Sequence, residues 1–113
     1  ADGMEVRLLC ALPRGAMAVF SLGPGRVGRA VAHRTVEDIW YFVAGKGRMW
    51  RRRDGGEEIV AVEPGVSVGI PLGTQFQLRC DSAEPLAAVA VTMPPWPGEE
   101  EAYFVDGIWP ATV

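Results

Sequence analysis

Helical periodicity is nearly absent from this sequence, and so are long apolar runs. Fourteen Gly and nine Pro interrupt its 113 residues at short intervals, and no apolar run approaches the roughly 20 residues that a membrane helix needs. The N-terminal segment shows no basic stretch followed by an apolar region, so no secretory signal is visible. Because 49% of the residues are hydrophobic, we expect a folded cytoplasmic domain with no membrane partner.

Positive charge is scarce as well. The net charge is −3, whereas a nucleic-acid-binding domain usually carries a strong basic excess or patch. The one basic run, Arg51 to Arg53, precedes the turn residues Asp54 to Gly56 and is interpreted as a solvated strand end, with an anion or partner contact as the alternative. Nucleic acid is therefore not an expected partner.

The sequence has only two cysteines, Cys10 and Cys80, and neither has a metal-binding spacing. Both lie in apolar segments that are typical of strands. We therefore expect two buried, reduced thiols, as in a cytoplasmic protein, with a disulfide as the alternative.

Short segments rich in Val, Ile, Phe and Trp between regular turn signals predict an all-β sandwich or barrel. The predicted strands are Glu5–Leu12, Ala16–Leu22, Arg29–Thr35, Asp38–Ala44, Arg48–Arg53, Glu57–Val62, Val66–Ile70, Gln75–Cys80 and Leu86–Thr92. The segment from Asp38 to Ala44 is apolar on both faces after Asp38, which predicts cover on both sides, by a core and by another layer or subunit. We expect a single domain, with a barrel over residues 1–93 and a Pro-rich, aromatic and acidic tail over 94–113 that packs on the barrel or on a neighbouring subunit.

The only histidine, His33, lies in the first of two gapped patterns. In this pattern Gly25 is followed after five residues by Val31, then by His33, after four more residues by Asp38, and after six more by Gly45. Neighbouring residues on a strand face opposite sides. If Asp38 points into a barrel, Glu37 therefore points out.

The second pattern holds Gly65, Pro71, Gly73, Phe76 and Cys80. Together the two patterns resemble the two signatures of the cupin superfamily, with all glycines and the proline in matching positions over residues 25–80. The resemblance implies a jelly-roll β-barrel, also called a double-stranded β-helix, that is often dimeric. It also implies a pocket in the barrel where three His and one Glu commonly bind a divalent metal.

The sequence departs from the family at the metal-ligand positions. Val31 and Phe76 replace two of the histidines, and Asp38 replaces the glutamate, so that only His33 and Asp38 could ligate a metal. Transition-metal sites usually have at least three protein ligands. No tightly held cofactor is therefore expected, and the alternative is a divalent transition metal held by His33 and Asp38.

The barrel interior is predicted to be an apolar, aromatic pocket with few polar groups, which is typical of small-molecule sites. The predicted lining residues are Val31, His33, Asp38, Trp40, Phe42, Phe76 and Leu78. The four tryptophans, Trp40, Trp50, Trp96 and Trp109, are expected in the core or at an interface. A ligand that stacks on Trp40 or Trp50 is the alternative.

Three functions remain open from the sequence. The first is a cupin that binds a small organic ligand in the barrel without a tightly bound metal. The second is an enzyme in which His33 and Asp38 are catalytic, either through a metal or as an acid–base pair of an isomerase, epimerase, cyclase or dioxygenase-like protein. The alternative to any functional role of His33 is a structural one, in which it is a buried histidine satisfied by hydrogen bonds. The third is a homodimeric structural or interaction module whose outer face and tail carry the function.

Overall fold

The computed structural model describes residues 4–113 and builds them into strands joined by turns. The strands are β1 (Glu5–Leu12), β2 (Gly15–Leu22), β3 (Val31–His33), β4 (Glu37–Ala44), β5 (Gly47–Arg53), β6 (Gly56–Val62), β7 (Ser67–Ile70), β8 (Gln75–Cys80), β9 (Leu86–Met93) and β10 (Ala102–Phe104). The part of the chain that the structure describes contains no helix long and apolar enough to cross a membrane.

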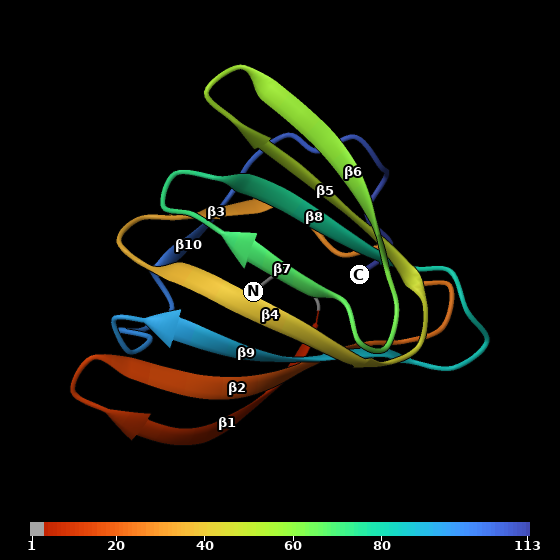
Figure 1. The fold of residues 1–113 in the computed structure, drawn as a ribbon. Helices are drawn as coiled ribbons and strands as arrows, with labels where there is room; N and C mark the ends of the chain where they lie inside the picture. The colour runs from red at the N-terminus through yellow and green to blue at the C-terminus, as the bar shows by residue number, and fades with distance from the viewer. Residues whose placement is uncertain (1–3) are drawn as a thin grey trace.

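The strands form two antiparallel sheets that face each other (Figure 1). One sheet has the order β1-β2-β9-β4-β7 and the other has the order β10-β3-β8-β5-β6. β1 and β6 are outer strands of the two sheets, at the bottom and the top of the view. The all-β jelly-roll prediction is therefore confirmed.

Two segments depart from the predicted strands. The expected strand over 29–35 is reduced to β3, because the backbone N–H of Thr35 donates to the carboxylate of Glu101 instead of joining a sheet ladder. β10 was missed, since its three residues lie in the tail and pair with β3.

The core lies between the two sheets. Along β4, Asp38, Trp40 and Phe42 are buried, and the residues between them face outward and are exposed. The alternation confirms that Asp38 points inward and Glu37 outward. The expectation of cover on both faces of this strand is not met within one chain, because the outer face of β4 is open to solvent.

The tail over 94–113 runs back along the second sheet. The side chain of Gln77 on β8 holds it: its amide N–H₂ donates to the carbonyls of Gly28 and Trp109, and its oxygen accepts from the backbone N–H groups of Ile108 and Trp109. Gly107 packs so close to Gln77 and Ala30 that a Cβ would collide with both side chains. The tail therefore covers the outer face of this sheet.

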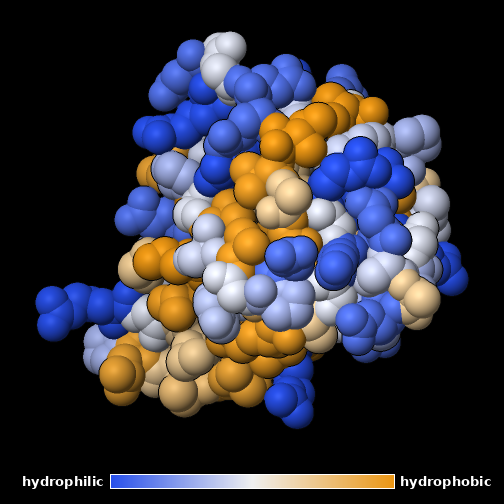
Figure 2. All heavy atoms as spheres, turned by 45° about the vertical axis from the view of Figure 1, so that its right-hand side comes forward, coloured by the Kyte–Doolittle hydropathy of each residue, from blue (hydrophilic) through white to orange (hydrophobic). Residues whose placement is uncertain are grey.

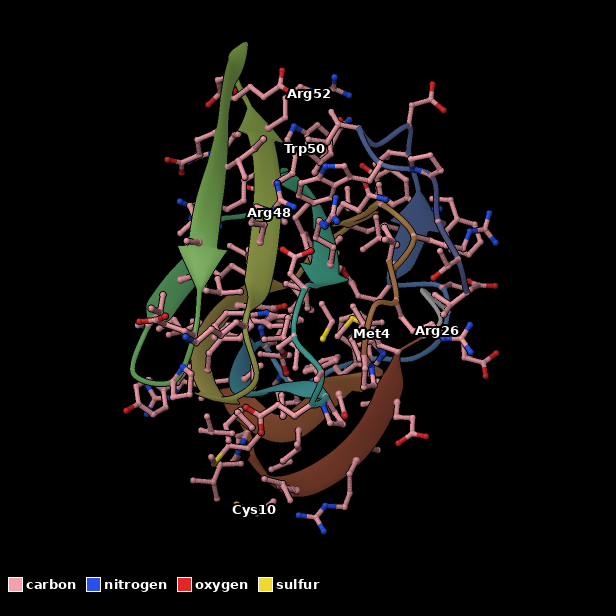
Figure 3. The ribbon with its side chains drawn as sticks, turned by 90° about the vertical axis from the view of Figure 1, so that its right-hand side faces the viewer. Met4, Cys10, Arg26, Arg48, Trp50 and Arg52 are labelled. Atoms are coloured by element: carbon pink, nitrogen blue, oxygen red, sulfur yellow. The ribbon has the colours of Figure 1, made fainter. Side chains whose placement is uncertain are left out.

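The two cysteines are free, and only Cys80 is buried. The prediction of two buried thiols is wrong for Cys10, because β1 is an outer strand that is exposed along its whole length. Figure 3 shows Cys10 on this strand, away from Arg48, Trp50 and Arg52 on β5.

Candidate functional site

A cavity of about 380 Å³ opens inside the barrel, between β1, β2, β3, β4, β8, β9 and the start of the tail. Its aromatic walls come from Phe20, Trp40, Phe76 and Trp96. The volume is in the range of small-molecule sites. The aromatic rings contact one another: Phe20 stacks on Trp40 with 4.6 Å between centroids, and Phe76 meets Trp40 edge to face at 5.9 Å.

Sheet register brings the polar groups of the cavity together. Asp38 on β4 pairs with Thr92 on β9, so their side chains are neighbours on the inner face. On the opposite sheet, Val31 of β3 pairs with Phe76 of β8, and His33 lies two residues further along the same face.

His33 and Asp38 meet across the cavity with 3.6 Å between Nδ1 and Oδ2, and both side chains are buried. This separation is longer than a hydrogen bond but within ion-pair distance if the imidazole carries a proton. The imidazole is held between aromatic rings, edge to face with Phe76 at 5.3 Å and with Trp96 at 5.0 Å. The pair that the sequence predicted is thus brought together, in an aromatic setting.

The carboxyl group of Asp38 has one satisfied oxygen and one without a protein partner. Oδ2 accepts a hydrogen bond of 3.1 Å from the indole N–H of Trp40, whereas Oδ1 is buried with no hydrogen-bond partner. Burial raises the pKa of Asp38 from its ordinary 3.8 to about 6; the Trp40 bond opposes this rise, and the negative charge of Glu101 adds to it. The Asp38 carboxyl group is therefore protonated more readily than an exposed aspartate.

Thr92 supplies a second buried polar atom with no protein partner, its hydroxyl Oγ1. Unpartnered buried polar atoms are rare in folded proteins, because each costs free energy that a hydrogen bond would recover. Thr92 and Asp38 therefore place two unmet hydrogen-bonding groups side by side in the cavity wall.

Of the seven residues predicted to line the cavity, the structure places five in its wall and two in the core only. Val31, His33, Asp38, Trp40 and Phe76 line the cavity, whereas the remaining two, Phe42 and Leu78, lie in the core cluster and not in its wall.

Trp50 is also absent from the cavity wall. It is fully buried, and its indole N–H donates to Glu57 at 2.6 Å. It alternates with the inward-facing Met49, and so it lies on the outer face of β5 (Figure 3). Trp40 is therefore the better placed of the two proposed stacking tryptophans.

Among the cavity residues that were not anticipated from the sequence, the aromatic and polar ones are Phe20, Thr92, Trp96 and Glu99. The alternation of the strand over 86–92 contained a signal for Thr92, since Leu86, Ala88, Ala90 and Thr92 share one face. No comparable signal existed for Trp96 and Glu99, because the path of the tail has no periodicity.

Glu101 fixes the loop that leads from His33 to Asp38. Its carboxylate accepts hydrogen bonds from the backbone N–H groups of Thr35 at 2.7 Å and Val36 at 3.1 Å, and from the hydroxyl of Thr35. Burial alone raises the pKa of Glu101, but these hydrogen bonds outweigh it, and the pKa lies below its ordinary value. The tail thus anchors the segment that orients both polar cavity residues.

The donor set does not fit the metal that the fold family implies. Val31 and Phe76 occupy two of the family's ligand positions with apolar side chains. Within residues 4–113, no group of three or more His, Cys, Asp or Glu side chains is placed to hold a metal ion. His33 and Asp38 alone give fewer ligands than transition-metal sites usually have.

Comparison with solved structures shows that the chain folds as a small cupin, a double-stranded β-helix. It is similar to a Klebsiella pneumoniae protein described as having a double-stranded β-helix domain, with a TM-score of 0.76 and 15% identity, over 95% of this chain and 89% of the other. It is similar to KdgF from Halomonas sp., with a TM-score of 0.71 and 17% identity, over 84% and 82% of the two chains.

A third similar structure is Bacillus subtilis oxalate decarboxylase, with a TM-score of 0.78 and 16% identity, over 93% of this chain but 28% of that larger one. A scan of protein-family models and a search of curated proteins find no match. At these identities the comparisons establish the fold, and the chemistry must be argued from the cavity itself.

Proposed function

We propose that the barrel cavity binds a small organic ligand, without a tightly bound metal. The observation that carries this proposal is the pair of unpartnered buried groups, Asp38 Oδ1 and Thr92 Oγ1, in the wall of an otherwise aromatic cavity. Each unsatisfied group costs about 1–3 kcal/mol. A ligand that supplies both hydrogen bonds recovers this cost, while its apolar part displaces water from the aromatic walls.

The test is a small-molecule screen by thermal shift, with a variant that fills the cavity. Ala18 is buried and lines the cavity, so Ala18→Met occupies part of its volume. Ala87→Met is the matched control, since Ala87 lies on the outer face of β9. We expect compounds that stabilise the wild type and A87M but not A18M. Binding that A18M leaves unchanged, or a screen in which nothing stabilises the wild type, contradicts the proposal.

An acid–base enzyme is the second candidate, because burial raises the pKa of Asp38 to about 6, and its Oδ2 lies 3.6 Å from Nδ1 of His33. Such a pair can move a proton to or from a bound carbon acid. The test is hydrogen–deuterium exchange at a carbon of each bound compound in D₂O, followed by NMR. Exchange that His33→Ala abolishes, at unchanged melting temperature, supports an isomerase-, epimerase- or cyclase-like reaction. A bound ligand with no exchange and no product supports a binding protein.

We also propose that the chain forms a homodimer through the outer face of the sheet that contains β4. Among its exposed residues are Met17, Ile39, Tyr41 and Val43, and the adjoining outer strand β1 exposes Leu12 at 76%. Figure 2 shows hydrophobic side chains gathered at the bottom of the molecule, where Figure 1 places β1 and β2. A second copy fits both the apolar part of this face and the unpaired strand edge, because an apolar patch can pack against its own copy.

A cytoplasmic location is part of the same proposal. The two free thiols, Cys10 and Cys80, support it, since reduced cysteines persist in reducing compartments. Localisation of a tagged full-length protein by fractionation tests it, and recovery outside the cytoplasm contradicts it.

A further inference from the structure

The charged groups that line the cavity are acidic. Asp38 lies in its wall at 2% exposure, and Glu99 lies exposed at its mouth. None of the lining residues in the described part of the chain is Lys or Arg. Outside His33, the cavity therefore offers no side chain that could neutralise a negatively charged ligand.

The aromatic faces of the cavity also take no cation from the protein itself. The arginines stack on aromatic rings elsewhere: Arg29 on Phe104, Arg34 on Tyr103, Arg52 on Trp50, and Arg48 and Arg79 on Trp109. Within residues 4–113, no such contact involves the four aromatic residues of the cavity. One face each of Phe20 and Trp40 is covered by their stacking on one another. The ring surface that lines the cavity takes no arginine, so a cation from outside can contact it, and such contacts strengthen when water is excluded.

We propose that the ligand is a small organic amine, bound as its ammonium cation against Asp38 with its apolar part among Trp40, Phe76 and Trp96. This inference rests on the proposed ligand-binding function and names the ligand class for the same cavity. The ammonium donates to the unpartnered Oδ1 of Asp38 and to the hydroxyl of Thr92. Glu99 at the mouth attracts the cation during its approach.

An anionic ligand fits the cavity poorly. A carboxylate or phosphate would meet Asp38 and Glu99 without a Lys or Arg partner, and a buried anion without such a partner carries a large desolvation cost. A neutral alcohol can form the same hydrogen bonds but gains neither the charge-assisted bond to Asp38 nor the cation–π contacts. The expected order of affinity is therefore amine, then alcohol, then carboxylate.

Three compounds with the same ring and a two-carbon chain test this order: 2-phenylethylamine, 2-phenylethanol and phenylacetate. Binding is measured by isothermal titration calorimetry at pH 8 and moderate salt. We expect 2-phenylethylamine to bind at least about tenfold more tightly than 2-phenylethanol, since charge-assisted hydrogen bonds are roughly twice as strong as neutral ones. No measurable binding of phenylacetate is expected.

Asp38→Asn should remove the preference of the cavity for the amine over the alcohol. Glu37→Gln is the matched control, because Glu37 immediately precedes Asp38 on β4 and is exposed on the opposite face of the strand. A second measurement needs no variant: wild-type affinity for the amine should fall between pH 8 and pH 5 as Asp38 gains a proton, while an aliphatic amine stays protonated. The groups that face Asp38 are His33 from β3, Trp40 and Thr92 from the same sheet, and Glu101 from the tail.

The outcomes separate the two proposals. Binding of 2-phenylethanol or phenylacetate as tight as that of the amine, lost in A18M, overturns the amine class and leaves the cavity as a ligand site. Amine binding that A18M and D38N leave unchanged places the amine outside the cavity and overturns the inference. If none of the three compounds binds, the amine class is also overturned, and the fragment screen alone then decides the ligand-binding function.

Discussion

Replacing Asp38 with Asn should make the protein more stable at alkaline pH, at the expense of its ligand site. Asp38 is 2% exposed, and burial raises its pKa from 3.8 to about 6. A raised pKa means that the folded state binds the proton more tightly than the unfolded chain. The favourable contribution is therefore present below pH 3.8 and is lost as the pH rises through 6. Above that pH, the folded protein contains a buried carboxylate that water would solvate better.

The size of this effect follows from the shift. A rise of about two pKa units lowers the unfolding free energy of the wild type by roughly 3 kcal/mol at pH 8. Near pH 4 the same loss is below about 1 kcal/mol. The asparagine side chain cannot ionise, so the variant avoids this loss. Its amide oxygen can still accept from Trp40, but its N–H₂ group needs partners and costs about 1–3 kcal/mol if it finds none. Because that cost is the same at every pH, the informative quantity is the change of the mutational effect with pH.

Urea unfolding of wild type and Asp38→Asn at intervals from pH 4 to pH 8 measures this change, with Glu37→Gln as the control on the outward face of β4. The difference between D38N and wild type should shift in favour of the variant by roughly 2–3 kcal/mol from pH 4 to pH 8, while E37Q should show a much smaller shift. A difference between D38N and wild type that stays constant over this range would refute the assignment of a buried, raised-pKa carboxyl group to Asp38.

Four further changes test other parts of the structure. Glu101→Ala should lower the unfolding free energy by about 2–4 kcal/mol, because it leaves buried backbone N–H groups without their acceptor; urea unfolding measures this. Gln77→Ala removes four hydrogen bonds to the backbone and should increase proteolysis of the tail by at least about tenfold, measured by mass spectrometry, since local opening then costs at least roughly 1.4 kcal/mol less. Ile39→Lys should convert the proposed dimer to a monomer in light scattering, because a charge is then buried in an apolar interface. The double variant Val31→His with Phe76→His should acquire stoichiometric Zn²⁺ binding by calorimetry, since it gives the cavity four metal ligands.

Each of these four has a matched control and an outcome that counts against it. Glu100→Ala, at the exposed neighbour of Glu101, should leave stability nearly unchanged; equal effects at the two positions would remove the anchoring role of Glu101. Gln75→Ala changes the same residue type on the same strand and should leave the tail protected. Ile59→Lys places the charge on β6, which is not part of the proposed interface, so a monomeric wild type or an effect of I59K equal to that of I39K rejects this dimer. Zinc binding by the wild type equal to that of the double variant would show that the ligand count is wrong.

The sequence by itself determined most of the strands and the central pair of the site, His33 and Asp38. Period-two alternation and regular Gly and Pro turns fixed the strands, because a side chain on a strand can face only one of two sides. The same alternation fixed that Asp38 and Glu37 face opposite sides, and the structure shows that Asp38 is the inward one. The spacing from Gly25 to Gly45 and from Gly65 to Cys80 carried the resemblance to the cupin signatures, and that resemblance implied the jelly-roll barrel and the positions of His33 and Asp38 within it.

Only the tertiary structure decided what surrounds that pair. Thr92 lies beside Asp38 because of the register between β4 and β9, and register between distant strands is a long-range property. Trp96, Glu99 and Glu101 reach the cavity or its supporting loop through a tail that has no periodicity to read. Arg29 and Arg79 stack on aromatic rings of the tail, Phe104 and Trp109, by packing between segments that are far apart in sequence. The polarity of the cavity, and with it the ligand class that we propose, therefore depends on contacts that a linear pattern does not contain.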